Sequence, residues 1–306
     1  MDARKGIEQL PFLERMGGEH RAKRGGMMKA ADENAVEDES MPDAHSLEGA
    51  SGSHSKRSAG AKPRRARRWP RRLVVALVAV VAACAIGFFA YVSDYYHAGD
   101  AALSLESSLA DAGELVETPD SIAVGDPHAK VGISFYPGAK VEPAAYVPLA
   151  SKLADEGYYC VIEKMPFNLA FFGINAASSA RAEAPDVQEW WLAGHSLGGV
   201  AAAQYASTHT GEVQGIIFLA SYSTADLSSA GMDCLIVYGD ADDVINRSAL
   251  ADNAGNLPAS TKTVVIEGGN HAGFGDYGAQ AGDGAASISA DEQQQRTASL
   301  IAALVG

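Results

Sequence analysis

Residues 190–203 of this 306-residue chain read WWLAGHSLGGVAAA, and this stretch decides the fold. Its first residues are apolar and typical of a buried strand, whereas the run from Leu197 onward is typical of a helix. Gly194 and Gly198 flank Ser196 between the two, in a G-x-S-x-G spacing. Glycine is required at both positions because a side chain there would collide with a tightly bent backbone. The stretch therefore predicts a strand, a sharp turn that carries Ser196, and a helix.

The predicted position of Ser196 at the start of a helix has a chemical consequence. The first backbone N–H groups of a helix lack intrahelical partners, and the positive end of the helix dipole favours negative charge. An oxyanion that develops beside Ser196 would therefore be stabilised. From this stretch alone, a glycine-rich turn whose serine merely caps the helix is the alternative.

Two later segments place an acid and a histidine after predicted strands. An apolar run, residues 234–238, is followed closely by the acidic cluster of residues 240–243. A second predicted strand, residues 261–267, is followed by a glycine-rich loop that contains His271. In open α/β sheets, catalytic groups gather at the carboxyl ends of the strands. We therefore expect Ser196, the acidic cluster and His271 to converge on one crevice.

The order of serine, acid and histidine along the chain is that of the α/β-hydrolase superfamily. From about Ile133 to about Ile301 the chain resembles this superfamily, and specifically its compact, lidless bacterial branch of the fold-5 type. Four ordered motifs carry the resemblance: the strand and loop of residues 133–140, the serine turn of residues 194–198, the G-x-x-D turn of residues 239–242 and the histidine loop of residues 269–271. The first motif departs from the family because Pro137-Gly138 replaces the common His-Gly pair. The oxyanion donor of that loop therefore stays open between Gly138 and Ala139.

The resemblance implies a Ser-His-Asp triad. His271 is expected to accept the proton of Ser196, because the unperturbed pKa of imidazole lies near neutrality. Asp242 is expected to orient the imidazole ring and to stabilise its protonated form. Asp240 and Asp243 remain alternatives for that acid.

The remaining site predictions concern oxyanion binding and the substrate pocket. The backbone N–H groups of Leu197 and of Gly138 or Ala139 are expected to bind the oxyanion. Tyr222 and Asn168 are expected to line the substrate pocket. No cofactor is expected, and no metal either, because the acidic cluster lacks the spaced ligands and the glycine of an EF-hand loop.

Three further side chains near these motifs are given structural roles. His195 is expected to pack under the serine turn rather than to act as a base. For Phe171 and Phe172, core packing is favoured over a place in the substrate pocket. The expectation for both rings is therefore burial.

Predicted strands and helices alternate along the rest of the chain, with helices expected near residues 169–181, over residues 197–208 and from Val244. This alternation predicts an α/β fold of the α/β-hydrolase type, with a mostly parallel, doubly wound sheet. Only a short segment separates the strand near Val213 from the strand at Cys234, where many α/β-hydrolases insert a cap. We therefore expect no large cap domain and an open site.

A stretch without charged or strongly polar residues runs from Leu73 to Val92. Twenty residues of helix cross a bilayer core of about 30 Å. The basic residues within 62–72 precede the stretch, and the positive-inside rule then places its N-terminal side in the cytoplasm. A cleaved signal peptide and a lipid anchor at Cys84 stay open as alternatives.

These observations predict a chain of four parts in a single-pass arrangement at the cell membrane. The predicted parts are a disordered cytoplasmic segment (1–72), a transmembrane helix (73–92), a juxtamembrane spacer (93–114) and an extracytoplasmic α/β-hydrolase domain (115–306). Before the span the chain has 16 basic and 11 acidic residues, and after it 8 and 27. A domain with this excess of acidic residues repels nucleic acid, so nucleic acid is not expected as a partner.

The expected function is that of a membrane-tethered serine hydrolase. Its substrate would be a small molecule with a carboxylic ester, thioester or related acyl bond, cleaved through an acyl-enzyme, and its other partner the lipid bilayer. A non-catalytic binding or scaffold module and a peptidase, both with the same fold, are the alternatives, because a fold does not by itself fix a function. The sequence leaves the oligomeric state undecided.

Overall fold

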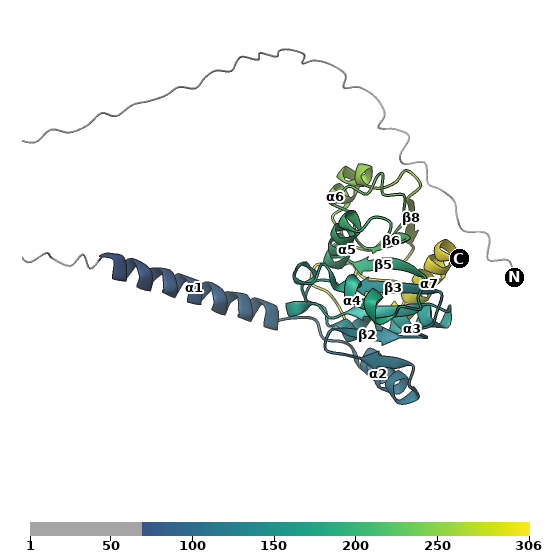
Figure 1. The fold of residues 1–306 in the computed structure, drawn as a ribbon, viewed down its shortest axis with the longest axis horizontal. Coiled ribbons are helices and arrows are strands. Elements are labelled where there is room, and N and C mark those ends of the chain that lie inside the picture. Colours follow the sequence, from purple (N-terminus) through teal and green to yellow (C-terminus); the bar gives the residue numbers. More distant parts are fainter. Residues whose placement is uncertain (1–68) are drawn as a thin grey trace, which may run out of the picture. The chain divides into compact units, whose positions relative to one another are not determined.

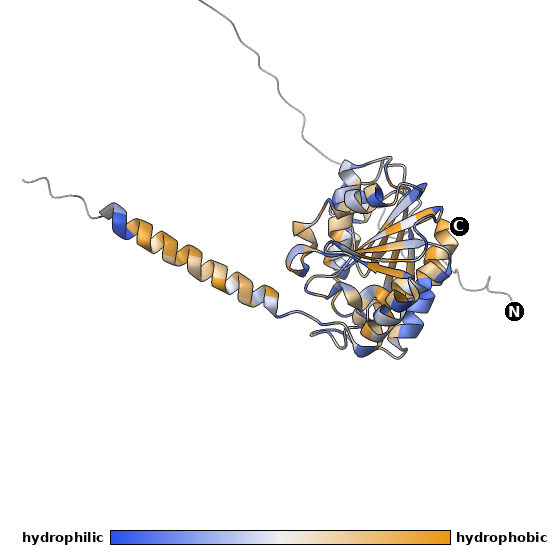
Figure 2. Ribbon diagram, turned by 60° about the horizontal axis from the view of Figure 1, so that its bottom comes forward, coloured by the Kyte–Doolittle hydropathy of each residue, from blue (hydrophilic) through white to orange (hydrophobic). Residues whose placement is uncertain are grey.

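The computed structural model describes residues 69–306, and Figure 1 shows their fold. Most of the predicted cytoplasmic segment, including most of its basic block, lies outside the described residues. The first element is helix α1 (Trp69–Ser93), which is apolar along most of its length (Figure 2). Among the described helices it is the one long and apolar enough to cross a membrane, and no part of its apolar window is buried.

The described strands form one sheet in the order β1-β2-β4-β3-β5-β6-β7-β8. Their bounds are β1 (Leu115–Glu117), β2 (Ser121–Val124), β3 (Val131–Tyr136), β4 (Tyr159–Glu163), β5 (Glu189–His195), β6 (Gly215–Leu219), β7 (Asp233–Gly239) and β8 (Lys262–Ile266). Strands β3 to β8 pair in parallel, whereas β2 is antiparallel to both β1 and β4. The mostly parallel sheet confirms the predicted fold class.

Helices and short 3₁₀ turns connect these strands. The helices after α1 are α2 (Asp100–Ala112), α3 (Val147–Asp155), α4 (Ala176–Glu183), α5 (Leu197–Thr208), α6 (Arg247–Asp252) and α7 (Ala290–Val305). The 3₁₀ turns are η1 (Pro143–Tyr146), η2 (Pro166–Asn168), η3 (Ala170–Phe172), η4 (Ala254–Asn256) and η5 (Ala272–Phe274). The described segment between β6 and β7 contains no helix, so the fold has no large cap domain.

Alternate residues of each strand pack on opposite faces of the sheet. On β5, Trp191 belongs to a core cluster with Leu149 of α3 and Ile301 of α7. Its neighbour Leu192 belongs to a second cluster with residues of α4 and α5, such as Ala201. Helices therefore cover both faces of the sheet, as in a doubly wound fold (Figure 1).

Two helices begin later than the sequence pattern suggests. A helix is expected near residues 169–181, but η3 occupies the first part of that range, and α4 begins only at Ala176. The residues just before the range form η2, where Phe167 and Asn168 have positive φ angles of 61° and 53°. Another is expected from Val244, but α6 begins only after Asn246, whose side chain accepts a hydrogen bond from the Ala249 N–H. In both places, irregular turns replace the beginning of the expected helix.

The segment between α1 and β1 packs on the rest of the domain. Helix α2 contacts η1, α3 and β1. Ala102 is fully buried there, and its N–H donates to Asp276 Oδ2 at 2.8 Å. The Gly99 N–H donates to the Asp276 carbonyl oxygen at 2.7 Å. These contacts hold the helix that follows α1 against the sheet layer.

Candidate active site

Ser196 lies at the turn between β5 and α5, in a strained backbone conformation. Its φ is 51° and its ψ is −123°, values that a residue with a side chain rarely adopts. A Cβ on Gly198 would lie 2.1 Å from the Tyr136 carbonyl oxygen, and one on Gly194 would lie 2.5 Å from Gly199 Cα. The predicted requirement for glycine at both positions therefore has a steric basis in the fold.

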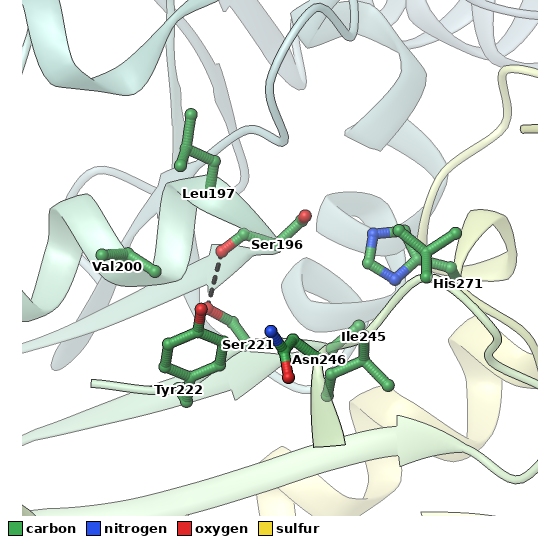
Figure 3. Close-up of a pocket in the computed structure, with 10 residues that line it drawn as sticks. Ser196, Leu197, Val200, Ser221, Tyr222, Ile245, Asn246 and His271 are labelled. Carbon is green, nitrogen blue, oxygen red and sulfur yellow. Dashed lines mark hydrogen bonds between the residues drawn. The ribbon is translucent and has the colours of Figure 1, made fainter. Parts of the chain in front are cut away.

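Two hydrogen bonds hold the backbone of this strained serine. The Ser196 N–H donates to the Leu219 carbonyl oxygen at 2.9 Å. Ser221 Oγ donates to the Ser196 carbonyl oxygen at 2.6 Å (Figure 3). Sequence reasoning missed Ser221, which no motif marks. With the backbone fixed in this way, the Ser196 hydroxyl points to the side of the pocket where His271 lies (Figure 3).

His271 pairs with Asp242 in the interior of the domain. His271 Nδ1 lies 3.0 Å from Asp242 Oδ2 and 3.1 Å from Oδ1, and both side chains are buried. A carboxylate only accepts hydrogen bonds, so the imidazole proton resides on Nδ1 and Nε2 is left with a lone pair. Among the described residues, Nε2 has no hydrogen-bond partner. The ring is therefore prepared to accept a proton at Nε2.

The three acids of the acidic cluster have different surroundings. Asp242 Oδ1 also accepts the N–H groups of Val244 at 2.9 Å and Ile245 at 2.8 Å, which fixes the orientation of the carboxyl group. Asp240 Oδ1 instead accepts the Gly268 N–H at 2.7 Å. Asp243 is exposed. Of the three acids left open by the sequence, Asp242 is thus the one that the fold brings to the histidine.

Two distant side chains hold the loop that carries His271. Asp283 accepts the His271 N–H through Oδ1 at 3.1 Å and the N–H of the next residue through Oδ2 at 2.8 Å. Buried Gln293 pairs with Asn270: its Oε1 accepts the Asn270 N–H at 3.0 Å, and its Nε2 donates to the Asn270 carbonyl oxygen at 2.8 Å. Sequence reasoning missed both side chains, because neither lies in a recognisable motif.

His195 is buried beside this pair, as the sequence suggested. Its Nδ1 lies 2.8 Å from Tyr146 Oη, and its ring centroid lies 4.6 Å from that of His271. Burial and the neighbouring His271 hold the pKa of His195 well below its ordinary value. The ring is therefore neutral and packs against His271.

Tyr146 also decides between the two candidate donors of the loop after β3. The Gly138 N–H donates to Tyr146 Oη at 3.0 Å in a buried contact, so this N–H is already engaged. The Ala139 N–H has no acceptor among residues 69–306. This loop packs directly on the serine turn, since a Cβ on Gly198 would also lie 2.4 Å from the Pro137 carbonyl oxygen. Ala139 is therefore the available donor of the pair.

A pocket of about 160 Å³ opens beside Ser196 (Figure 3). Its lining includes Leu197, Tyr222 and His271, all of which the sequence placed at the site. Asn168 was also expected to line the pocket, but it lies outside this pocket, and its carbonyl oxygen accepts the Lys140 N–H at 2.7 Å. Its position in η2 turns it toward the loop after β3 instead.

The expectation of burial for Phe171 and Phe172 is wrong. Their side chains are 51% and 56% exposed. Both lie in η3, a short turn at the surface, where the sequence pattern suggested a packed helix. Among the described residues, no group of three or more His, Cys, Asp or Glu side chains is arranged to hold a metal ion.

The model of the alpha/beta hydrolase family matches residues 132–295, which is more than half of the chain. The protein belongs to this family. Among solved structures, one similar to it is that of a membrane phospholipase A described as a novel bacterial virulence factor. The two chains are 14% identical with a TM-score of 0.50, and the match covers 77% of this chain and 98% of that one.

Two further similar structures are those of a predicted CIB-like hydrolase from Thermoplasma acidophilum and of Est1E from Butyrivibrio proteoclasticus. Their identities are 15% and 12%, with a TM-score of 0.46 for each. The matches cover 62% of this chain in both cases, and 97% and 98% of the other chains. A comparison with curated proteins finds no match. The likeness to the phospholipase A, at a TM-score of 0.50, shows the fold alone, and the site itself must carry the chemistry.

Proposed function

We propose that this α/β-hydrolase is a membrane-tethered serine hydrolase that cleaves a carboxylic ester, thioester or related acyl bond through an acyl-enzyme. One observation carries the proposal. The contact with Asp242 places the His271 proton on Nδ1, and Nε2 has no partner within residues 69–306, at a pocket that Ser196 also lines. An arrangement of this kind is what a serine needs to become a nucleophile.

In the first half of the reaction, Ser196 Oγ attacks the acyl carbon while its proton passes to His271 Nε2. The imidazolium formed in this step is stabilised by the Asp242 carboxylate. The carbon–heteroatom bond of the tetrahedral intermediate then breaks, and Nε2 returns the proton to the departing alcohol or thiol. The acyl group is left as an ester on Ser196.

Water completes the cycle by the same route in the second half. It gives a proton to His271 Nε2 and adds to the acyl carbon, and Ser196 Oγ leaves with that proton, so a carboxylic acid is released. We assign to the N–H groups of Leu197 and Ala139 the role of hydrogen-bonding the oxyanion in both tetrahedral intermediates. Loss of one such donor lowers transition-state stabilisation by about 3–4 kcal/mol in other hydrolases.

The proposal assigns α1 as the tether. Its apolar window is unburied, and a helix of this length matches a bilayer core of about 30 Å. The basic residues before it assign its N-terminal side to the cytoplasm and the α/β-hydrolase domain to the outer side of the cell membrane. The short connection between β6 and β7 favours the compact, lidless bacterial branch of the family.

Labelling by a fluorophosphonate probe tests the proposed nucleophile on the full chain in detergent. We expect wild-type protein to be labelled at Ser196 and the Ser196→Ala and His271→Ala variants to stay unlabelled. Ser228→Ala, which removes an exposed serine outside the pocket, is the matched control and should label like wild type. Ester hydrolysis should fall by about 10⁴-fold or more in the first two variants. An unlabelled wild-type protein, or a labelled Ser196→Ala variant, would overturn the proposal.

A further inference from the structure

Three exposed phenylalanines lie together in the turns that follow β4. Phe167 in η2 is 44% exposed, and Phe171 and Phe172 in η3 are 51% and 56% exposed. Phe167 and Phe172 contact each other edge to face, with ring centroids 5.6 Å apart. We call these three side chains the aromatic patch. Contiguous exposed apolar side chains of this size mark an interaction surface on a folded domain.

The aromatic patch is continuous with the last turns of α1. The Phe88 ring lies 5.2 Å from that of Phe167 and 6.1 Å from that of Phe172, in edge-to-face contacts. The Phe89 ring lies 6.1 Å from that of Phe167. The patch therefore extends the apolar surface of the proposed span sideways onto the hydrolase domain.

The position of Phe88 along α1 sets the depth of this contact. Phe88 precedes Val92, the last residue of the apolar stretch, by four residues. At 1.5 Å per residue this places Phe88 about 6 Å inside the end of the span. Rings that touch it lie at a similar depth, which is that of the boundary between headgroups and acyl chains. Aromatic side chains are enriched at this level of membrane proteins.

Backbone hydrogen bonds hold the domain close to the end of α1. The Tyr96 N–H donates to the Lys140 carbonyl oxygen at 2.7 Å, and the Glu142 N–H donates to the Tyr96 carbonyl oxygen at 2.9 Å. Lys140 Nζ lies 3.2 Å from Asp94 and 4.4 Å from the centroid of the Tyr91 ring. The segment that leaves the span is thus paired with the domain within a few residues, and no long linker separates the aromatic patch from the membrane.

The geometry points to the aromatic patch as a membrane-docking surface, inserted into the leaflet that the C-terminal end of α1 reaches. The inference rests on the tether in the proposed function and not on the chemistry of Ser196. Lys140 fits this surface, because a lysine can keep its ammonium group among the headgroups while its stem lies against apolar surface. The Lys140 N–H donates to the Asn168 carbonyl oxygen, so the patch is also tied to the loop that carries Ala139.

Fluorescence quenching by lipid tests the docking. The full chain is reconstituted in vesicles of phosphatidylcholine and phosphatidylglycerol, with or without a phosphatidylcholine that carries a doxyl group near the headgroup. Phe171→Trp introduces a reporter in the patch. Val265→Trp is the matched control, because Val265 is 38% exposed but lies outside the aromatic patch, on the edge strand β8, which is separated from β4 by several strands. The native tryptophans contribute equally to both variants.

We expect doxyl lipid to quench the added Phe171→Trp emission at least about twofold more than the added Val265→Trp emission. Equal quenching in the two variants would overturn the docking. The measurement is repeated in the Ser196→Ala background, where the same difference is expected, so failure of the proposed chemistry leaves the result intact. Removal of the chain from vesicles by alkaline carbonate would overturn the tether, and the docking with it.

Discussion

The substitution Asp242→Asn tests whether Asp242 orients the His271 ring and fixes its tautomer or only packs against it. Asp242 Oδ1 accepts two backbone N–H groups, at 2.8 Å and 2.9 Å, and lies 3.1 Å from His271 Nδ1, whereas Oδ2 makes the shorter contact with Nδ1, at 3.0 Å. An asparagine at this position keeps its carbonyl oxygen where Oδ1 lies, because an NH₂ group there would face two donors. Its NH₂ group then replaces Oδ2 and donates to His271 Nδ1. The imidazole proton is thereby forced onto Nε2, which can no longer accept the proton of Ser196.

The expected loss follows from this change of tautomer. The same substitution in the triad of serine proteases lowers kcat about 10⁴-fold with the geometry intact. That factor corresponds to about 5.5 kcal/mol of transition-state stabilisation. We expect a similar loss here, measured as kcat for p-nitrophenyl acetate with the full chain in detergent. Thermal unfolding should change little, because the asparagine keeps the two backbone hydrogen bonds and the volume of the aspartate.

Two neighbouring substitutions serve as controls for this result. Asp240→Asn keeps an oxygen that accepts the Gly268 N–H, and Asp243→Asn changes an exposed side chain, so both should keep kcat within about threefold of wild type. Retention of more than about a tenth of wild-type kcat by Asp242→Asn would refute the role assigned to this carboxylate. A larger loss in Asp240→Asn than in Asp242→Asn would refute the choice of acid.

Three further outcomes test the support of the site, a buried acid and the topology. Gln293→Ala should lower the free energy of unfolding in urea by about 2–4 kcal/mol, because it removes a buried side chain and leaves the partly buried N–H and carbonyl of Asn270 unpaired. Gln295→Ala, exposed on the same helix, should change it by less than about 0.5 kcal/mol. Burial raises the pKa of Glu163 to about 8. The folded protein therefore keeps a proton that the unfolded chain loses above about pH 4.5, so the free energy of unfolding falls as the pH rises from about 4.5 to about 8. Glu163→Gln, which can still accept from Ser134, should therefore raise Tm more at about pH 9 than at about pH 5, and an equal effect at both would contradict the shift. Protease added to intact cells should digest a C-terminal tag and spare an N-terminal one, and a protected C-terminal tag would reverse the proposed orientation.

The sequence alone predicted the elements whose causes are local. A helix is expected over residues 197–208, and α5 has these bounds, because a glycine-flanked turn and an apolar run fix where it begins. The buried parallel strands and their alternation with helices likewise follow from short apolar runs. Strands β1 and β2, of three and four residues, were not predicted, because runs so short show no periodicity.

At the site, the order of motifs along the sequence indicated which residue types react, but not which side chains each of them contacts. The G-x-S-x-G spacing singled out Ser196, and a glycine-rich loop after a strand singled out His271. The choice of Asp242 among three nearby carboxylates depended on which one the turn after β7 directs toward His271. The exposure of Phe171 likewise depended on a turn at the surface that the apolar pattern could not distinguish from a buried helix.

The remaining features of the site were decided by the tertiary structure. Tyr146 Oη accepts the Gly138 N–H, which leaves Ala139 as the donor of this loop that has no acceptor within the described part of the chain. Tyr146 also contacts His195, which lies 49 residues away along the chain. Gln293 holds the histidine loop from a helix 23 residues beyond Asn270. Hydrogen-bond partners of this kind are set by which elements the fold packs together, whereas turns and apolar runs are set by neighbours in the chain. The sequence by itself therefore determined the fold class and the order of the reactive groups, and long-range packing decided their partners, their protonation and their exposure.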